Sequence, residues 1–155
     1  MNRIGQMLIL LLCFVFTGCA KDTPTVVSIT HDTGDREYHI LIGYDSLSVK
    51  QTLMNKSNHL EPFFTDIEYL SLEAVDHIAE YITANCRNVS LDNNVEFTNF
   101  FIFGIYYPNE KSTKCNLIED TMDPGYFRGL IKWIQESPYN KESENLIKKL
   151  KVFVR

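Results

Sequence analysis

An unbroken apolar run near the N-terminus constrains this 155-residue chain more than any other feature. Arg3 is the one charge before ten residues, Met7–Phe16, that carry no polar side chain. As a helix, ten residues extend roughly 15 Å, about half the hydrocarbon thickness of a bilayer. The run is too short to span, and its position is typical of the hydrophobic region of a signal peptide. A buried core helix is the alternative, but the run has no amphipathic face. We expect residues 1–18 to be a signal peptide that is removed from the mature chain.

The residues that follow the run indicate how the mature chain is held. Phe16-Thr17-Gly18-Cys19 resembles the lipobox of bacterial lipoproteins, which places an apolar residue and two small ones before a cysteine. Phe16 is bulkier than the usual leucine, and the resemblance covers only the signal segment. It implies cleavage after Gly18, diacylation of Cys19 with palmitate-type chains and acylation of the new N-terminus. Two or more acyl chains, at about 0.8 kcal/mol per buried methylene, anchor a protein stably.

The residues after Cys19 bear on localisation. Ala20 stands where an aspartate would resemble a signal for retention in the inner membrane, so we expect the outer membrane, at its periplasmic face or at the cell surface. Residues 19–25 form a short segment that is polar from Lys21 onward and contains Pro24, which is typical of a linker. We interpret them as a lipidated tether, short enough to keep the domain near the membrane.

Length and charge limit what the remaining chain can do. Removal of residues 1–18 leaves 137 residues, and we expect a single domain over 26–155. Arg3 leaves with the signal, so 14 Lys and Arg remain against 20 Asp and Glu, a net charge of −6. This acidic balance argues against nucleic acid as a partner and against electrostatic docking on anionic lipid.

Two cysteines, Cys86 and Cys115, remain once Cys13 is removed and Cys19 is acylated. In an oxidising compartment a disulfide is the default interpretation. Two buried thiols or one reactive thiol are the alternatives. Closing a loop of about thirty residues stabilises a fold by roughly 3–4 kcal/mol in the chain-entropy model.

Alternating apolar residues predict a hairpin at the start of the domain. Strands over 26–31 and 37–44 flank Asp32-Thr33-Gly34-Asp35, which has turn composition. Either of the two tight registers places His39 opposite Ser28 or Ile29. Asp45 is positioned to cap a helix over 46–55, and 66–70 is a short strand.

The rest of the domain alternates helices and strands. Ser71 precedes a helix to about Arg87, with Cys86 on its apolar stripe. Val95–Tyr107 is the strongest strand, and 113–118 returns antiparallel with Cys115 on one face. If that face of the strand meets the helices, Cys115 lies toward Cys86 on the apolar stripe, which agrees with a Cys86–Cys115 bridge. Asp123-Pro124 predicts the start of a helix to about Glu136, and a last helix covers 141–153. The order ββαβαββαα predicts an α+β two-layer sandwich, a mostly antiparallel sheet of about five strands with helices packed on one face.

No arrangement of residues in the sequence identifies a catalytic, metal or cofactor site. The histidines show no ligand spacing, and the best cluster, Glu73, His77 and Glu80, is expected to be a solvated helix face. Glycine-rich phosphate loops and nucleophile motifs are absent from the sequence. Cys86 follows a helix C-terminus, where the dipole raises a thiol pKa and disfavours a nucleophile.

Aromatic residues are abundant, and some fall at the edges of the apolar stripes. Tyr126 and Trp133 share one flank of the same helix, and Phe63 and Phe64 lie in a loop that is apolar for its position. Tyr and Trp suit protein interfaces. We treat these four as candidate interface residues, with packing at the rim of the core or the end of the sheet as the alternative.

Two functions remain open. The sequence favours a lipid-anchored, non-enzymatic module of the bacterial envelope that binds a protein, such as an immunity or inhibitor protein or a component of an assembly. The alternative is a small envelope hydrolase whose site is assembled from dispersed residues around His77 or His59. The sequence identifies neither partner nor substrate.

Overall fold

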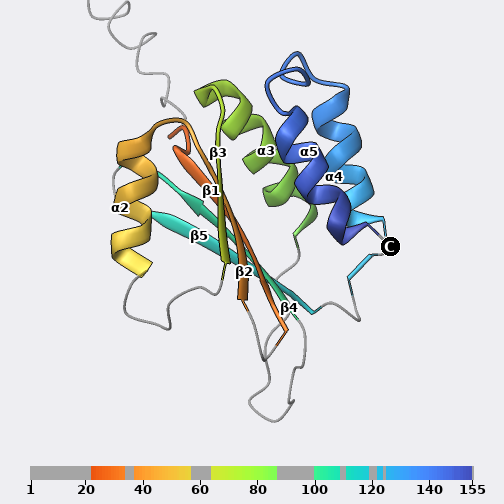
Figure 1. The fold of residues 1–155 in the computed structure, drawn as a ribbon, viewed down its shortest axis with the longest axis horizontal. Coiled ribbons are helices and arrows are strands. Elements are labelled where there is room, and N and C mark those ends of the chain that lie inside the picture. Colours follow the sequence, from red (N-terminus) through yellow and green to blue (C-terminus); the bar gives the residue numbers. More distant parts are fainter. Residues whose placement is uncertain are drawn as a thin grey trace, which may run out of the picture.

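The computed structural model describes residues 22–33, 37–56, 64–86, 100–108, 111–118, 122–123 and 125–154. Its elements follow the order β1 (Val26–Asp32), β2 (Glu37–Gly43), α2 (Ser46–Lys56), β3 (Phe64–Tyr69), α3 (Leu72–Asn85), β4 (Phe100–Tyr106), β5 (Ser112–Ile118), α4 (Tyr126–Gln135), α5 (Glu144–Leu150) and the 3-10 turn η2 (Lys151–Phe153). This is the predicted order ββαβαββαα (Figure 1).

The five strands form one open sheet in the order β3-β2-β1-β4-β5. β1 pairs antiparallel with β2 and β4, and β4 pairs antiparallel with β5. β3 is the exception because it runs parallel to β2 at one edge. The predicted α+β class, with a mostly antiparallel sheet of five strands, is confirmed.

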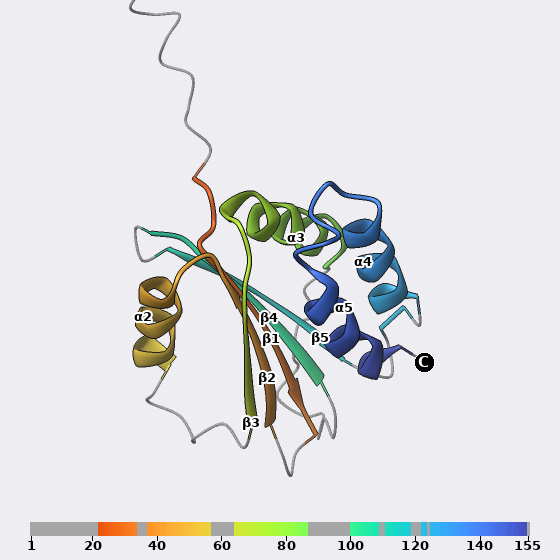
Figure 2. The same ribbon diagram turned by 45° about the horizontal axis from the view of Figure 1, so that its top comes forward.

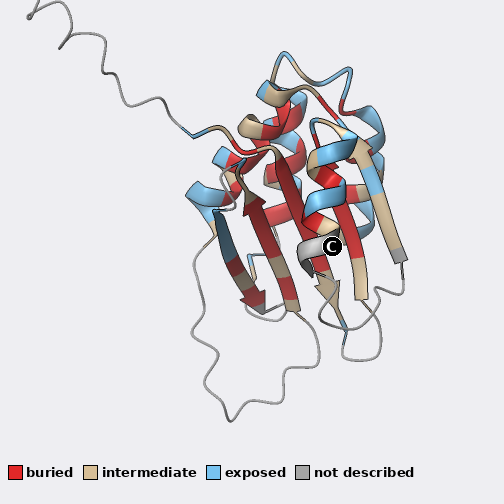
Figure 3. Cartoon of the chain, turned by 90° about the vertical axis from the view of Figure 1, so that its left-hand side faces the viewer, coloured by how far each residue is buried: buried red, intermediate tan, exposed pale blue. Residues whose placement is uncertain are grey.

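Helices α3, α4 and α5 cover one face of the sheet, as Figures 1 and 2 show. Alternate residues of the inner strands point into this layer, so the strand period of two matches the helical stripes facing it. Figure 3 shows the buried residues along these inner strands. The sheet's contribution to this core is Val27, Ile29, Ile40, Ile42, Phe101, Phe103, Ile105, Cys115 and Leu117.

Helix α2 packs on the opposite face, over one end of the sheet (Figure 2). Val49 of α2 forms a second small core there with Val26 and Leu41. A Cβ at Gly43 would overlap the side chain of Val49, so glycine permits this close approach. The prediction of helices on one face therefore holds for α3, α4 and α5 and is wrong for α2, the remaining α-helix of the described residues.

Helix starts follow the expected caps in two cases and differ in the third. Asp45 accepts the backbone N–H of Ser48 at 2.8 Å, and Ser71 accepts that of Ala74 at 3.3 Å. Asp123 instead accepts the N–H of Gly125 at 2.7 Å, in a turn before α4 begins at Tyr126. The predicted start at Asp123-Pro124 is thus early, because the aspartate caps a turn instead of the helix.

The β1–β2 register corrects one prediction. Asp32 pairs with Glu37, which places His39 opposite Thr30 and not opposite Ser28 or Ile29. Four residues, 33–36, separate the last paired positions, so the connection is longer than the tight turn that we assumed. The apolar faces nevertheless follow the alternation, because Ile29 pairs with Ile40 and Val27 with Ile42, and all four lie in the core under the helices.

Candidate functional site

A hollow of about 280 Å³ lies over the outer face of α3. Residues of α3 at helical spacing form its floor, and the tether and the α4–α5 connection contribute its sides. We call it the α3 hollow; it is lined by Thr23, Leu72, Glu73, Asp76, His77, Glu80 and Tyr139. The predicted cluster Glu73, His77 and Glu80 is part of this lining. With three carboxylates at its surface, the α3 hollow favours cationic groups.

An aromatic cluster adjoins the α3 hollow and joins α3 to α4. The rings of His77 and Trp133 stack at 4.7 Å with an angle of 9° between them. Trp133 donates its indole N–H to the carbonyl oxygen of His77 at 3.0 Å, and His77 Nε2 lies 3.3 Å from the carbonyl oxygen of Trp133. Tyr139 lies 5.6 Å from the His77 ring. His77 is therefore held by α4, and its Nε2 is engaged by a backbone carbonyl.

No metal centre is formed by the described part of the chain. None of its groups of three or more His, Cys, Asp or Glu side chains could hold an ion. The carboxylates of the α3 hollow project from a single helix, where residues three and four apart stand side by side. They can attract a cation of a partner, but they do not converge on one point.

A second polar cluster lies in the sheet, on the face opposite α3. His39 Nδ1 lies 3.3 Å from the Thr30 hydroxyl, and Nε2 lies 2.9 Å from a Glu37 carboxylate oxygen. This order of hydroxyl, imidazole and carboxylate is the one that hydrolases use. Thr30 is only 4% exposed and His39 9%, and neither lines the α3 hollow. The cluster satisfies the polar atoms of a buried histidine.

A third cluster fastens the edge strand β3 to α5. The Lys149 ammonium lies 3.0 Å from Asp66 and 2.6 Å from Glu68, and Tyr38 donates its hydroxyl to Asp66 at 2.8 Å. Burial would raise the pKa of Asp66, but the bonds from Tyr38 and Lys149 outweigh it and lower that pKa. Burial and the Asp66 carboxylate raise the pKa of Tyr38 to about 12. Sequence reasoning missed this cluster because its partners are some eighty residues apart.

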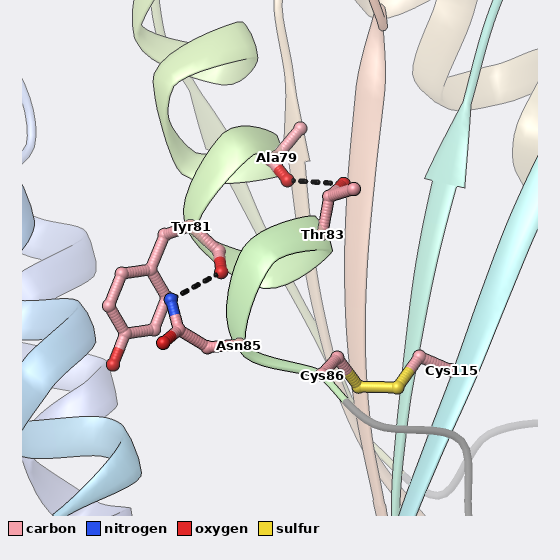
Figure 4. The surroundings of a disulfide bond; sticks show 6 residues. All are labelled: Ala79, Tyr81, Thr83, Asn85, Cys86 and Cys115. Atoms are coloured by element: carbon pink, nitrogen blue, oxygen red, sulfur yellow. Dashed lines mark hydrogen bonds between the residues drawn. A yellow bond between two sulfur atoms is a disulfide. The ribbon is translucent and has the colours of Figure 1, made fainter.

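Cys86 and Cys115 are joined in a disulfide, with 6.2 Å between their Cα atoms (Figure 4). Cys86 is the residue that ends α3, and its N–H donates to the carbonyl of Ile82. Cys115 is buried on the face of β5 that meets the helices. The bridge thus ties the end of α3 to an edge strand, as the helix and strand phases predicted.

Of the four candidate interface residues, only Tyr126 and Trp133 have described side chains, and these two differ in exposure. Trp133 is 40% exposed, whereas Tyr126 is 5% exposed and packs against the rings of Phe103 and Phe127. Tyr126 is therefore a core residue and offers no surface to a partner. Phe63 lies outside the described residues, as does Cys19, and Phe64 is described only as a backbone position of β3.

Tyr81 and Tyr139 belong to the aromatic cluster beside Trp133, and the spacing of residues along the sequence did not bring them together with it. Tyr81 lies 6.1 Å from the Trp133 ring and donates its hydroxyl to the carbonyl of Tyr126. Burial raises the pKa of Tyr81 and, more strongly, that of Tyr126. Both phenols therefore stay neutral at physiological pH.

Of the helices in the described residues, none is long and apolar enough to cross a bilayer. Comparison with protein-family models, with curated proteins and with solved structures finds no match to this chain.

Proposed function

We propose that the chain is a lipid-anchored protein of the bacterial envelope, held through Cys19 in the outer membrane, whose domain binds another protein without catalysing a reaction. An immunity or inhibitor protein and a component of an envelope assembly are the two roles that fit. The lipobox-like segment supports the anchor, and the properties of the α3 hollow support the binding role.

One observation carries the proposal: a half-exposed tryptophan stands beside an acidic hollow. Trp133 is 40% exposed next to His77, which lines the α3 hollow together with Glu73, Asp76 and Glu80. Tryptophan is enriched among the residues that dominate binding energy at protein interfaces. Carboxylates beside it favour a partner that presents lysine or arginine there.

The Thr30–His39–Glu37 cluster favours the second candidate, a small hydrolase. In such an enzyme the imidazole takes the hydroxyl proton while the carboxylate holds the other ring nitrogen. A substrate would have to reach a Thr30 hydroxyl in a residue that is 96% buried, which makes this candidate the weaker one. His39→Gln keeps a polar side chain there, and loss of a measurable ester or amide hydrolysis in that variant would favour the enzyme.

Charge removal in the α3 hollow tests the binding role. Glu73→Gln should weaken partner binding by about tenfold or more, because a charge-assisted hydrogen bond contributes roughly 1.5–3 kcal/mol and each 1.4 kcal/mol is about tenfold in affinity. Glu144→Gln is the matched control, since Glu144 is also an exposed glutamate in the first turn of a helix. Affinity for the partner captured from envelope extract is measured for both full-length variants. Equal affinity of Glu73→Gln and Glu144→Gln would remove the α3 hollow from the interface.

A further inference from the structure

Three large side chains are exposed together at one end of the sheet. Tyr44 is 48%, Leu47 65% and Tyr69 53% exposed, and we call them the end patch. Tyr69 pairs with Gly43, the residue before Tyr44, and Leu47 stands in the first turn of α2 immediately after. Single exposed apolar residues are ordinary, but three within one sheet end form an apolar surface.

The tether enters the domain at this same end. The Thr25 carbonyl accepts the N–H of Tyr44 at 3.1 Å, and the Thr25 N–H donates to the carbonyl of Tyr106 at 2.8 Å. Figure 2 shows residues 22–25 leaving the sheet between α2 and α3. Cys19 lies six residues before Thr25, a length of chain that reaches at most about 20 Å when extended. A lipid at Cys19 would therefore hold the end patch close to the membrane surface.

We propose that the end patch lies in the interfacial layer of the membrane that carries the anchor. The inference rests on the proposed lipidation of Cys19. Tyrosine suits this layer because its ring is apolar and its hydroxyl can stay with the headgroups, and leucine adds apolar area. The three residues of the end patch carry no charge, so contact with lipid does not depend on anionic headgroups.

Such a contact fixes the orientation of the domain. Thr23 of the tether lines the α3 hollow, so the hollow lies near the membrane plane. The opposite end of β1 and β2 points away from the membrane, and η2 lies there, since Phe153 packs against the rings of His31 and Tyr38. A partner would thus reach the α3 hollow from a position close to the bilayer.

Spin labels test the inference in the full-length acylated protein. In the processed protein Leu47→Cys and Val152→Cys each give one free thiol, because Cys13 leaves with residues 1–18, Cys19 is acylated and Cys86 pairs with Cys115. Val152 is the matched control, an aliphatic residue that is 76% exposed at the far end. A nitroxide is attached to each thiol, and the protein is reconstituted in vesicles of phosphatidylethanolamine and phosphatidylglycerol. Collisions with oxygen and with a water-soluble nickel chelate are measured, and Tyr69→Cys gives a second position if Leu47→Cys does not fold.

The label at 47 should lose collisions with nickel and gain them with oxygen, whereas the label at 152 should keep its exposure to nickel. Equal exposure of both labels in protein that floats with the vesicles would overturn this inference alone. Protein that does not float lacks the anchor, which overturns the lipidation and this inference together. A label at 47 that is shielded in native envelope membranes but not in protein-free vesicles is covered by another protein, and that result also overturns the membrane contact.

Discussion

Trp133 is a surface residue whose indole N–H makes a hydrogen bond within the fold. Its indole N–H is satisfied by the carbonyl of His77 on another helix, and its ring stacks on the His77 imidazole. The same side chain thus fixes α4 against α3 and presents a face to solvent. A substitution here should change stability and binding together, which is why Glu73 is the cleaner test of the interface.

Trp133→Ala should lower the free energy of unfolding by roughly 2–3 kcal/mol, the sum of a hydrogen bond and a stacked aromatic pair. Trp133→Phe keeps a ring and should lose about 1 kcal/mol. Urea unfolding measures both, with Gln135→Ala as the control because Gln135 is exposed on the same helix. An unchanged midpoint for Trp133→Ala would mean that the contact between α3 and α4 does not depend on this side chain.

Asp66 accounts for part of the stability that the fold should lose at acidic pH. Its lowered pKa means that the Asp66 carboxyl stays ionised to a lower pH in the folded state than in the unfolded chain. This stabilisation is complete above the unfolded pKa of about 4 and is lost as the pH falls through the lower folded value. Asp66→Asn should therefore cost roughly 1 kcal/mol at pH 7 and make the decline of stability below the unfolded pKa of about 4 shallower.

The control for Asp66 is Asp22→Asn. Asp22 lies 3.4 Å from Lys111, but both side chains are more than half exposed. Such pairs contribute little, so the free energy of unfolding should change by less than about 0.5 kcal/mol at pH 7. The free energy of unfolding is measured in urea at a series of pH values. The same decline at acidic pH in Asp66→Asn and in the native protein would contradict the role of the β3–α5 cluster.

At the scale of elements, local sequence patterns predicted a helix start or a strand face correctly where a single cap residue or the alternation of apolar residues determines it. Ser71 and Asp45 cap the helices that follow them, and the alternation along β4 and β5 set their faces. The register of β1 and β2 was not predictable from the alternation, because the observed register and the one that pairs His39 with Ser28 differ by two residues and leave every side chain on the same face. The Thr30–His39 pairing followed from that register, so the polar cluster in the sheet was missed.

The disulfide is the strongest single link between elements that are distant in sequence. Replacing both Cys86 and Cys115 with Ala should cost roughly 3–4 kcal/mol, since the bridge closes a loop across 29 residues. Mass spectrometry of the exported protein without reduction should find the two peptides linked. Two thiols that both react with an alkylating agent in denaturant before reduction would show that the bridge does not form in the envelope.

At the scale of the whole molecule, the position of α2 depends on the sheet. α2 connects β2 to the parallel strand β3, and crossovers between parallel strands have one preferred hand, which limits the helix to one face. Parallel pairing was not readable from six residues of β3, where Asp66 and Glu68 face the helices and Lys149 compensates them. Partly buried carboxylates on an edge strand are predictable only when their distant partner is known.

The proposed anchor at Cys19 would give the molecule a membrane-facing end, which an unattached domain would lack. Cys19→Ala should abolish incorporation of labelled palmitate and leave the chain either unprocessed, with residues 1–18 still attached, or free in the soluble envelope fraction. The physical reason is that stable anchoring needs two or more acyl chains, and this variant can carry none at position 19.

Cys13→Ala is the matched control for this prediction, because it removes a cysteine from the same apolar segment but leaves Thr17-Gly18-Cys19 intact. It should incorporate palmitate, be cleaved after Gly18 and fractionate with membranes like the native chain. Palmitate that still labels Cys19→Ala would place the lipid elsewhere, and the six-residue reach between anchor and Thr25 would no longer hold the end patch at the bilayer. Intact mass of the mature protein distinguishes these cases, since acyl chains and the retained signal each add a defined mass.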